Sequence, residues 1–374
     1  MKLFKSLLVA PATLGLLAPL SATANEVTIS DFTPAEQLAV TNSRVDGLEA
    51  RLNNIEAGSF SETTTASFSA DMAIGATDGV SGEEAVTATY AFQIDLNTSF
   101  TGEDSLDISI DAGNAAAQVA EFDLNGDAGA GTDVLTVDGV AYTFPVAGAT
   151  VFVGDNMDGS TLYSTACVYG GPSNNLDDCG NGSSAMAGGS GTAAGASYEF
   201  GDGFAIAAGY TGAGSATAGL MTKEGSDTFG GQLSYSADSY GASITYANVE
   251  GGDGLNDDRN YLGLNGYWTP AETGAMPSIS AGYEVGSADG LSDTTQWFVG
   301  LQWDEAGPGT FGTAIGTIGA SVGDKYDPEF LMYEAFYSYE INDGMTITPL
   351  IYTKETAAGS DDLTGIMVKT SFSF

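Results

Sequence analysis

Apolar and polar residues alternate with a period of two from about residue 60 to the C-terminus, and this pattern restricts the fold more than any other feature. It is clearest at the end of the chain, where Ile366, Val368 and Phe372 alternate with polar neighbours up to Phe374. Successive side chains of a β-strand point to opposite faces, so the pattern predicts strands with one apolar and one polar face. Similar stretches recur at 68–74, 90–97, 106–111, 204–210, 229–235, 240–246, 279–285 and 297–303.

Three details favour a membrane barrel over a soluble sandwich. Many stretches approach the ~9–11 residues that a tilted membrane strand needs. Aromatic residues often close the apolar face at both ends, as Tyr240 and Tyr246 do, which is typical of interfacial girdles. The polar face carries charges and amides such as Gln93 and Asp95, which a wet interior tolerates and a packed core does not. We therefore predict an all-β, transmembrane antiparallel barrel over residues 59–374.

The number of alternating stretches gives 14 to 18 strands. Single-chain bacterial barrels have an even number of strands, so we expect 16, a size that leaves an aqueous channel.

Strand parity predicts which polar side chains face the lumen. The acidic and amide candidates are Asp71, Gln93, Asp95, Asp107, Asp111, Gln232, Glu284 and Gln302, and the basic ones are Lys369 and Arg259. Their balance favours a negative lumen that prefers cations. In the alternative interpretation these side chains only solvate the wall, and a single loop sets the selectivity.

Charge and composition exclude several functions. The chain has 49 acidic and 9 basic residues, a formal net charge of −40, whereas nucleic-acid binding needs clustered Lys and Arg. It contains no His, which removes His-dependent catalysis and His-ligated metal sites. We expect neither an enzyme nor a cofactor or metal site.

The N-terminus has the pattern of a signal peptide over residues 1–24. Lys2 and Lys5 precede an apolar stretch, and Ala22-Thr23-Ala24 is a small-residue cleavage site. An uncleaved membrane anchor is the alternative, although the apolar stretch is short and interrupted by prolines.

Residues 35–57, within a short N-terminal segment over 25–58, have the pattern of a helix. Apolar residues with a period of 3.5 predict a coiled-coil seam formed by Leu38, Val45, Leu48, Leu52 and Ile55. A helix this short is marginal alone in water, so we expect it to form only where an oligomer holds copies together. A single amphipathic helix that lies on its own barrel or plugs it is the alternative.

Residues 154–194 form a long stretch rich in Gly, Asn, Ser and Asp that contains the only two cysteines, Cys167 and Cys179. Export to an oxidising compartment would allow these cysteines to form a disulfide. Loops of this length are usually functional or disordered. Two interpretations are equally open: a rigid loop that constricts the channel, or a stapled external loop that resists proteolysis.

Several segments resemble porins of marine unicellular cyanobacteria, which belong with the carbohydrate-selective porin superfamily. They are Met1–Ala12, Leu14–Pro19, Ser59–Ala70, Tyr142–Val146 and Lys369–Phe374. The resemblance implies a trimeric channel for ions and small polar solutes in the outer membrane. Many members carry a cell-wall-binding domain before the coiled coil, and here only Asn25 to about Pro34 precede the helix. Sugar selectivity is not carried over, because no sugar-binding residue can be matched.

The last strand also resembles the terminal strand that the barrel assembly machinery recognises, with Phe372 and Phe374 as the signal. Passive permeation is the function expected for such a barrel, within outer-membrane lipid. The alternative is a structural outer-membrane barrel or a surface adhesin whose loops are the functional part.

Overall fold

The computed structural model describes residues 64–79, 84–114, 119, 121–122, 124, 133–186, 190–214, 219–222, 225–251, 258–272, 275–318, 330–356 and 361–374. The chain divides into two units, 1–59 and 60–374, and everything described belongs to the second. The predicted signal peptide and coiled-coil helix lie outside the described residues.

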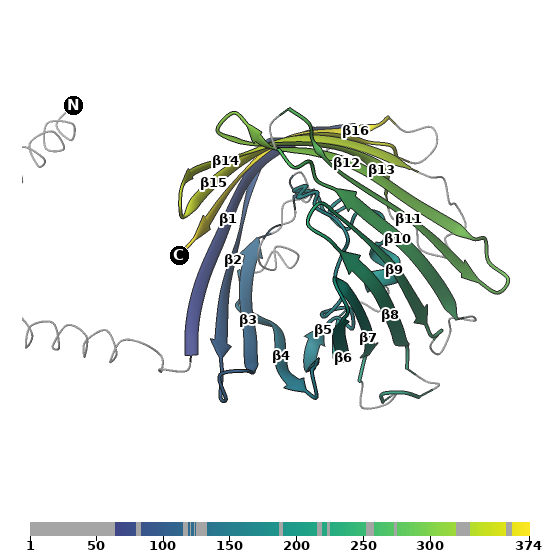
Figure 1. Cartoon of the computed structure of the whole chain (residues 1–374). Helices are drawn as coiled ribbons and strands as arrows, with labels where there is room; N and C mark the ends of the chain where they lie inside the picture. The colour runs from purple at the N-terminus through teal and green to yellow at the C-terminus, as the bar shows by residue number, and fades with distance from the viewer. Residues whose placement is uncertain are drawn as a thin grey trace, which may run out of the picture. The chain divides into compact units, whose positions relative to one another are not determined.

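Sixteen antiparallel strands form one closed barrel, in which each strand pairs with its neighbours in sequence and β1 pairs with β16 (Figure 1). The prediction of an all-β antiparallel barrel with 16 strands is confirmed. The strands are β1 (Thr64–Asp78), β2 (Thr87–Thr98), β3 (Ser105–Asn114), β4 (Thr136–Val146), β5 (Ala149–Met157), β6 (Gly191–Phe200), β7 (Phe204–Gly212), β8 (Asp227–Ser236), β9 (Tyr240–Val249), β10 (Arg259–Trp268), β11 (Ser278–Ala288), β12 (Thr294–Ala306), β13 (Gly309–Thr317), β14 (Leu331–Asn342), β15 (Met345–Lys354) and β16 (Leu363–Ser373). Among the residues that the structure describes, one short helix, α4 (Gly182–Met186), lies between β5 and β6.

The C-terminal residue completes the closure of the barrel. Phe374 and Phe68 exchange backbone hydrogen bonds of 2.9 and 3.0 Å, and their rings stack with centroids 5.8 Å apart. Because closure pairs the two edge strands, neither β1 nor β16 leaves a row of unpaired backbone groups to face lipid.

The outer face is apolar, as the alternation predicts. On β9, Tyr240, Ile244 and Tyr246 are 52%, 43% and 47% exposed, whereas the intervening Ser243 and Thr245 are buried. In a barrel this exposure is to the outside, so these side chains would contact lipid.

The two ends of the barrel differ in their connections. The end that holds Thr64 and Phe374 has tight turns such as 147–148, 307–308 and 343–344, and the opposite end has the long connections. Ala147 and Gly148 both adopt positive φ, of 52° and 87°, as a tight hairpin between twisted strands requires. Aromatic pairs gather near the short turns, including Tyr142 with Phe144, Phe200 with Phe204, and Trp303 with Phe311.

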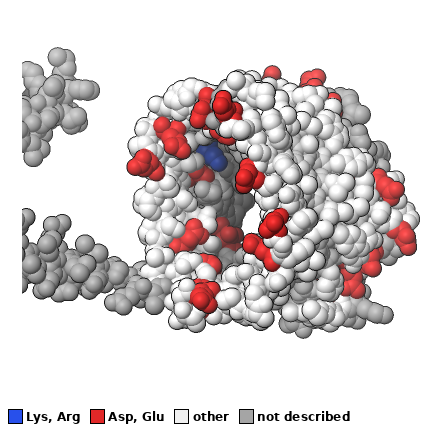
Figure 2. Space-filling view, viewed as in Figure 1, with Lys and Arg blue, Asp and Glu red and all other residues white. Residues whose placement is uncertain are grey.

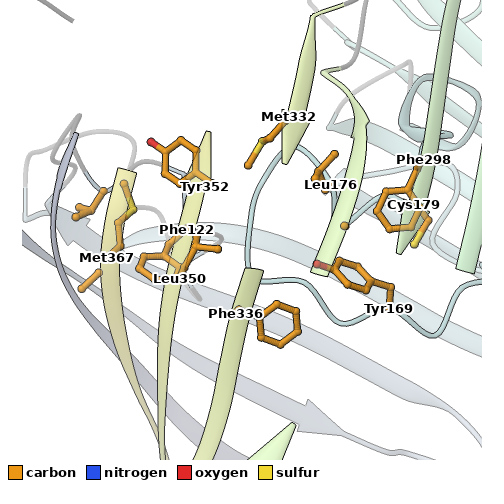
Figure 3. Packing of buried hydrophobic residues seen from close by; sticks show 13 residues of the cluster. Phe122, Tyr169, Leu176, Cys179, Phe298, Met332, Phe336, Leu350, Tyr352 and Met367 are labelled. Carbon is orange, nitrogen blue, oxygen red and sulfur yellow. The ribbon is translucent and has the colours of Figure 1, made fainter. Parts of the chain in front are cut away.

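The inner face departs from the alternation on β12 to β16, where apolar side chains also point inward. They form a buried cluster inside the barrel together with side chains from the β3–β4 and β5–β6 connections (Figure 3). Its members are Ala73, Val119, Phe122, Tyr169, Leu176, Cys179, Phe298, Ala314, Met332, Phe336, Leu350, Tyr352 and Met367. The prediction that each strand turns its polar face to the interior is therefore wrong for this part of the wall, since side chains from the two connections cover it and exclude water.

Candidate functional site

The described part of the β5–β6 connection, residues 158–186, folds into the barrel and lies along its inner wall. Its backbone N–H groups donate to side chains that point inward from four strands, β7, β8, β11 and β12. Gly159 N donates to Thr211 Oγ1 on β7 (2.6 Å), Ser164 N to Gln232 Oε1 on β8 (2.7 Å), Val168 N to Ser280 Oγ on β11 (3.0 Å) and Gly170 N to Gln302 Oε1 on β12 (2.8 Å). We call residues 158–186 the inner loop.

Three further hydrogen bonds fasten the inner loop. Tyr169 Oη donates to Glu334 Oε1 on β14 (2.6 Å). Asn265 Nδ2 on β10 donates to the Cys179 carbonyl oxygen (2.9 Å). Ser184 N in α4 donates to Glu284 Oε2 on β11 (2.5 Å).

A disulfide joins Cys167 to Cys179, whose Cα atoms are 6.4 Å apart. Cys179 is fully buried against the wall, so the cross-link lies within the barrel. Of the two interpretations left open by the sequence, this position matches the loop folded into the channel rather than the external one.

Two wall glycines allow the inner loop to approach the strands closely. A Cβ on Gly209 would lie 1.7 Å from the Gly159 carbonyl oxygen, and one on Gly282 would lie 1.8 Å from that of Cys179. Any side chain there would push the inner loop away from the wall.

Burial, together with the nearby Glu334, raises the pKa of Tyr169 well above its ordinary value. The phenol therefore stays protonated and acts as a hydrogen-bond donor to the carboxylate. Burial likewise raises the pKa of Asp178, which accepts a hydrogen bond from Gly180 N (2.8 Å).

The inner face of β2 and β3 forms an acidic wall. Asp95 Oδ1 accepts hydrogen bonds from Gln93 Nε2 (2.8 Å) and Ser109 Oγ (2.7 Å), and Asp107 accepts from Asn97 Nδ2 (2.5 Å). The register pairs Asp95 with Ser109 and Asn97 with Asp107, so these groups lie side by side. These hydrogen-bond donors are uncharged, so they fix both carboxylates without neutralising their negative charge.

All the residues predicted to line the lumen lie at inward positions of their strands, and they divide by environment. Gln232, Glu284 and Gln302 hold the inner loop. Asp71 and Asp111 are 0% and 2% exposed. Gln93, Asp95, Asp107, Arg259 and Lys369 are partly exposed. The predicted set therefore mixes loop anchors with groups that ions could approach.

Sequence reasoning missed Tyr169, Glu334, Lys354 and Glu121. Glu334 and Lys354 occupy inward positions of their strands, as Met332 and Tyr352 beside them do, so parity could have identified both. Glu121 and Tyr169 lie in connections, whose paths have no periodic signal.

The space-filling view shows a hollow in this face of the barrel, with acidic side chains around its rim and a basic side chain on its inner wall (Figure 2). Among the described residues no cluster of His, Cys, Asp and Glu is arranged to hold a metal ion. No helix in the same part of the chain is long and apolar enough to cross a membrane.

A closed barrel of sixteen strands with a long connection folded inside it matches solved structures over most of its length. OprB of Pseudomonas putida superimposes with a TM-score of 0.59 at 12% identity, over 83% of this chain and 94% of that one. The fold is that of bacterial outer-membrane porins. An anion-selective porin from Comamonas acidovorans gives 0.58 at 14% identity, over 83% and 99% of the two chains. OmpT of Vibrio cholerae, in a loop-deletion form, gives 0.57 at 11% identity, over 84% and 100%.

No protein-family model matches the sequence, and no curated protein matches it significantly. The porin fold therefore rests on structure alone. It is consistent with a place in the outer membrane, and the solved porins it matches are channels rather than enzymes.

Proposed function

We propose that this protein is an outer-membrane porin that forms a passive, water-filled channel for ions and small polar solutes, with a preference for cations. The observation that carries the proposal is the position of the inner loop. Hydrogen bonds to side chains of at least five strands hold this loop inside the barrel. A connection held in this way narrows the lumen without closing it, and so sets a size limit for solutes.

The cation preference follows from the side chains that face the lumen. The porin from Comamonas acidovorans is anion-selective, so the shared fold does not determine which ions pass. Here the β2–β3 wall presents Asp95 and Asp107. A passage lined by one sign of charge concentrates ions of the opposite sign.

A structural outer-membrane barrel without channel activity is the second candidate. It is favoured by the apolar cluster, since side chains from two connections fill part of the interior. In such a barrel the remaining space would be too small or too discontinuous for hydrated ions.

Reconstitution into a planar lipid bilayer separates the two candidates. A channel gives discrete current steps in KCl, and vesicles that contain it swell in small sugars but not in large ones. Protein that inserts with the heat-modifiable gel mobility of a folded barrel and yet carries no current would support the structural candidate.

We further propose that the protein forms a homotrimer. Its coiled-coil seam consists of Leu38, Val45, Leu48, Leu52 and Ile55. The signal peptide over residues 1–24 directs export, and the terminal Phe372 and Phe374 direct assembly into the outer membrane. The support is the heptad pattern and the resemblance to cyanobacterial porins. An unheated sample should run on a gel at three times the monomer mass. A monomer under the same conditions would count against the seam.

A further inference from the structure

The described part of the chain contains three basic residues, Arg259, Lys354 and Lys369, and strand parity places all three on the inner wall. A positive charge there opposes cation entry, so the surroundings of each matter for the ion preference. Lys354 forms an ion pair whose partner comes from a connection rather than from a strand.

Glu121, in the β3–β4 connection, is this partner. Its Oε2 lies 2.5 Å from Lys354 Nζ at the long-loop end of β15. The Glu121 side chain is only 3% exposed, whereas that of Lys354 is 25% exposed and so reaches the water of the lumen. A carboxylate at this distance cancels most of the field that Lys354 would direct at a passing ion.

The inner loop fixes Glu121 independently of Lys354. Asn175 Nδ2 donates to Glu121 Oε1, and Asn174 N donates to the Glu121 carbonyl oxygen (3.0 Å). The next residue, Phe122, forms an isolated β-bridge with Ser173. The carboxylate is therefore held by a segment that the Cys167–Cys179 disulfide encloses.

Apolar contacts hold the other side of the β3–β4 connection. Val119 and Phe122 are 0% and 1% exposed and belong to the cluster inside the barrel. Figure 3 shows Phe122 beside Leu350 and Met367 of β15 and β16. Glu121 is thus placed against Lys354 by packing on the wall and by hydrogen bonds to the inner loop.

We propose that Glu121 is a specificity-determining residue that masks the charge of Lys354 and so lets the acidic wall dominate the ion preference. The inference rests on the proposed channel function. It assigns a second connection, in addition to the inner loop, to the control of permeation.

The test is the reversal potential of single channels under a KCl gradient, measured for the wild type, Glu121→Gln and the double variant Glu121→Gln/Lys354→Gln. Glu121→Gln exposes Lys354 and should lower the cation-to-anion permeability ratio about two- to fivefold. The double variant removes both charges and should return to the wild-type ratio.

An unchanged ratio in Glu121→Gln would overturn the inference. So would a double variant that stays as low as the single one, because the loss would then not depend on Lys354. Should Glu121→Gln fail to insert, Lys354→Gln decides in its place. It leaves the Glu121 carboxylate without its partner and should raise the cation-to-anion permeability ratio, and an unchanged ratio would overturn the inference.

The same records distinguish failure of the proposed function. A wild type that carries no current removes the channel, and the inference with it. A wild type that prefers anions removes the cation preference, while the difference between the variants still measures the masking.

Discussion

The hydroxyl of Tyr169 donates a 2.6 Å hydrogen bond to Glu334 and thereby joins the inner loop to the inner face of β14. The Tyr169 ring also packs against Phe298 and Phe336, with centroids 5.3 and 5.8 Å away. Glu334 is only 3% exposed, so this carboxylate depends on protein donors. The contact combines a buried polar pair with the apolar cluster, and we expect it to be the strongest single attachment of the inner loop.

Tyr169→Phe should destabilise the barrel by about 1–3 kcal/mol, because it leaves a buried carboxylate without its hydroxyl donor. Urea unfolding in detergent micelles measures the change, and single-channel records should show a noisier open current. Tyr333→Phe is the matched control, since Tyr333 lies on the same strand and is 45% exposed on the outer face. Equal stability of the two variants would show that the Tyr169–Glu334 hydrogen bond contributes little.

Loss of the disulfide should loosen the inner loop. A 12-residue separation corresponds to about 3 kcal/mol of constraint in the chain-entropy description. The double variant Cys167→Ser/Cys179→Ser should therefore show a larger and more variable conductance than the wild type. Dithiothreitol should shift the wild type in the same direction and leave the double variant unchanged. An effect of dithiothreitol on the double variant would mean that the reagent acts elsewhere.

Asp95→Asn and Asp107→Asn should each lower the cation-to-anion permeability ratio, by about twofold, because each removes one fixed charge from the lumen. Asparagine keeps the shape of the side chain, so the conductance should change less than the ratio. Asp238→Asn removes an equal charge in the exposed β8–β9 turn and serves as the control. A fall of the same size in the control would assign the selectivity to overall charge rather than to the β2–β3 wall.

The stability of the β2–β3 turn should depend on pH through Asp104. A hydrogen bond from the Tyr142 hydroxyl (2.7 Å), with others from Thr101 and Ser99, holds the pKa of Asp104 well below its usual range. The unfolded chain binds this proton near pH ~4 and the folded chain only at lower pH. The stabilisation is therefore complete above about pH 4 and is lost as the pH falls through the lower, folded-state value.

Urea unfolding at about pH 6 and about pH 3 checks this dependence. The free energy of unfolding should fall more for the wild type than for Asp104→Asn, which lacks the titrating group. Equal losses in the two proteins would show that Asp104 does not contribute.

The strands, their number and the direction of their side chains could be predicted from the sequence. A barrel exposed to lipid repeats one rule at every strand: outward side chains are apolar and alternate with inward ones. Ile366, Val368 and Phe372 point outward as that rule requires, and Lys369 points inward. The path of a connection follows no such rule. The attachment of Tyr169 to Glu334 depends on two groups 165 residues apart, which no local pattern relates.

The apolar inner wall was also beyond a prediction from alternation alone. Met332, Leu350 and Met367 point inward and are nearly inaccessible to solvent, although strand parity assigns them to water. They are covered by Val119 and Leu176 of the inward-folded connections. Apolar residues on both faces of β14 to β16 were the available signal, since such a strand needs a cover on its inner side.

The reversal potential of the wild-type protein in a planar bilayer, under a tenfold KCl gradient, tests the central claim most directly. Current steps whose reversal potential has the sign of the potassium equilibrium potential would show a water-filled passage whose fixed charge is negative. A reversal potential with the sign of chloride would contradict the acidic lumen. The absence of current from correctly folded, inserted protein would contradict the channel itself.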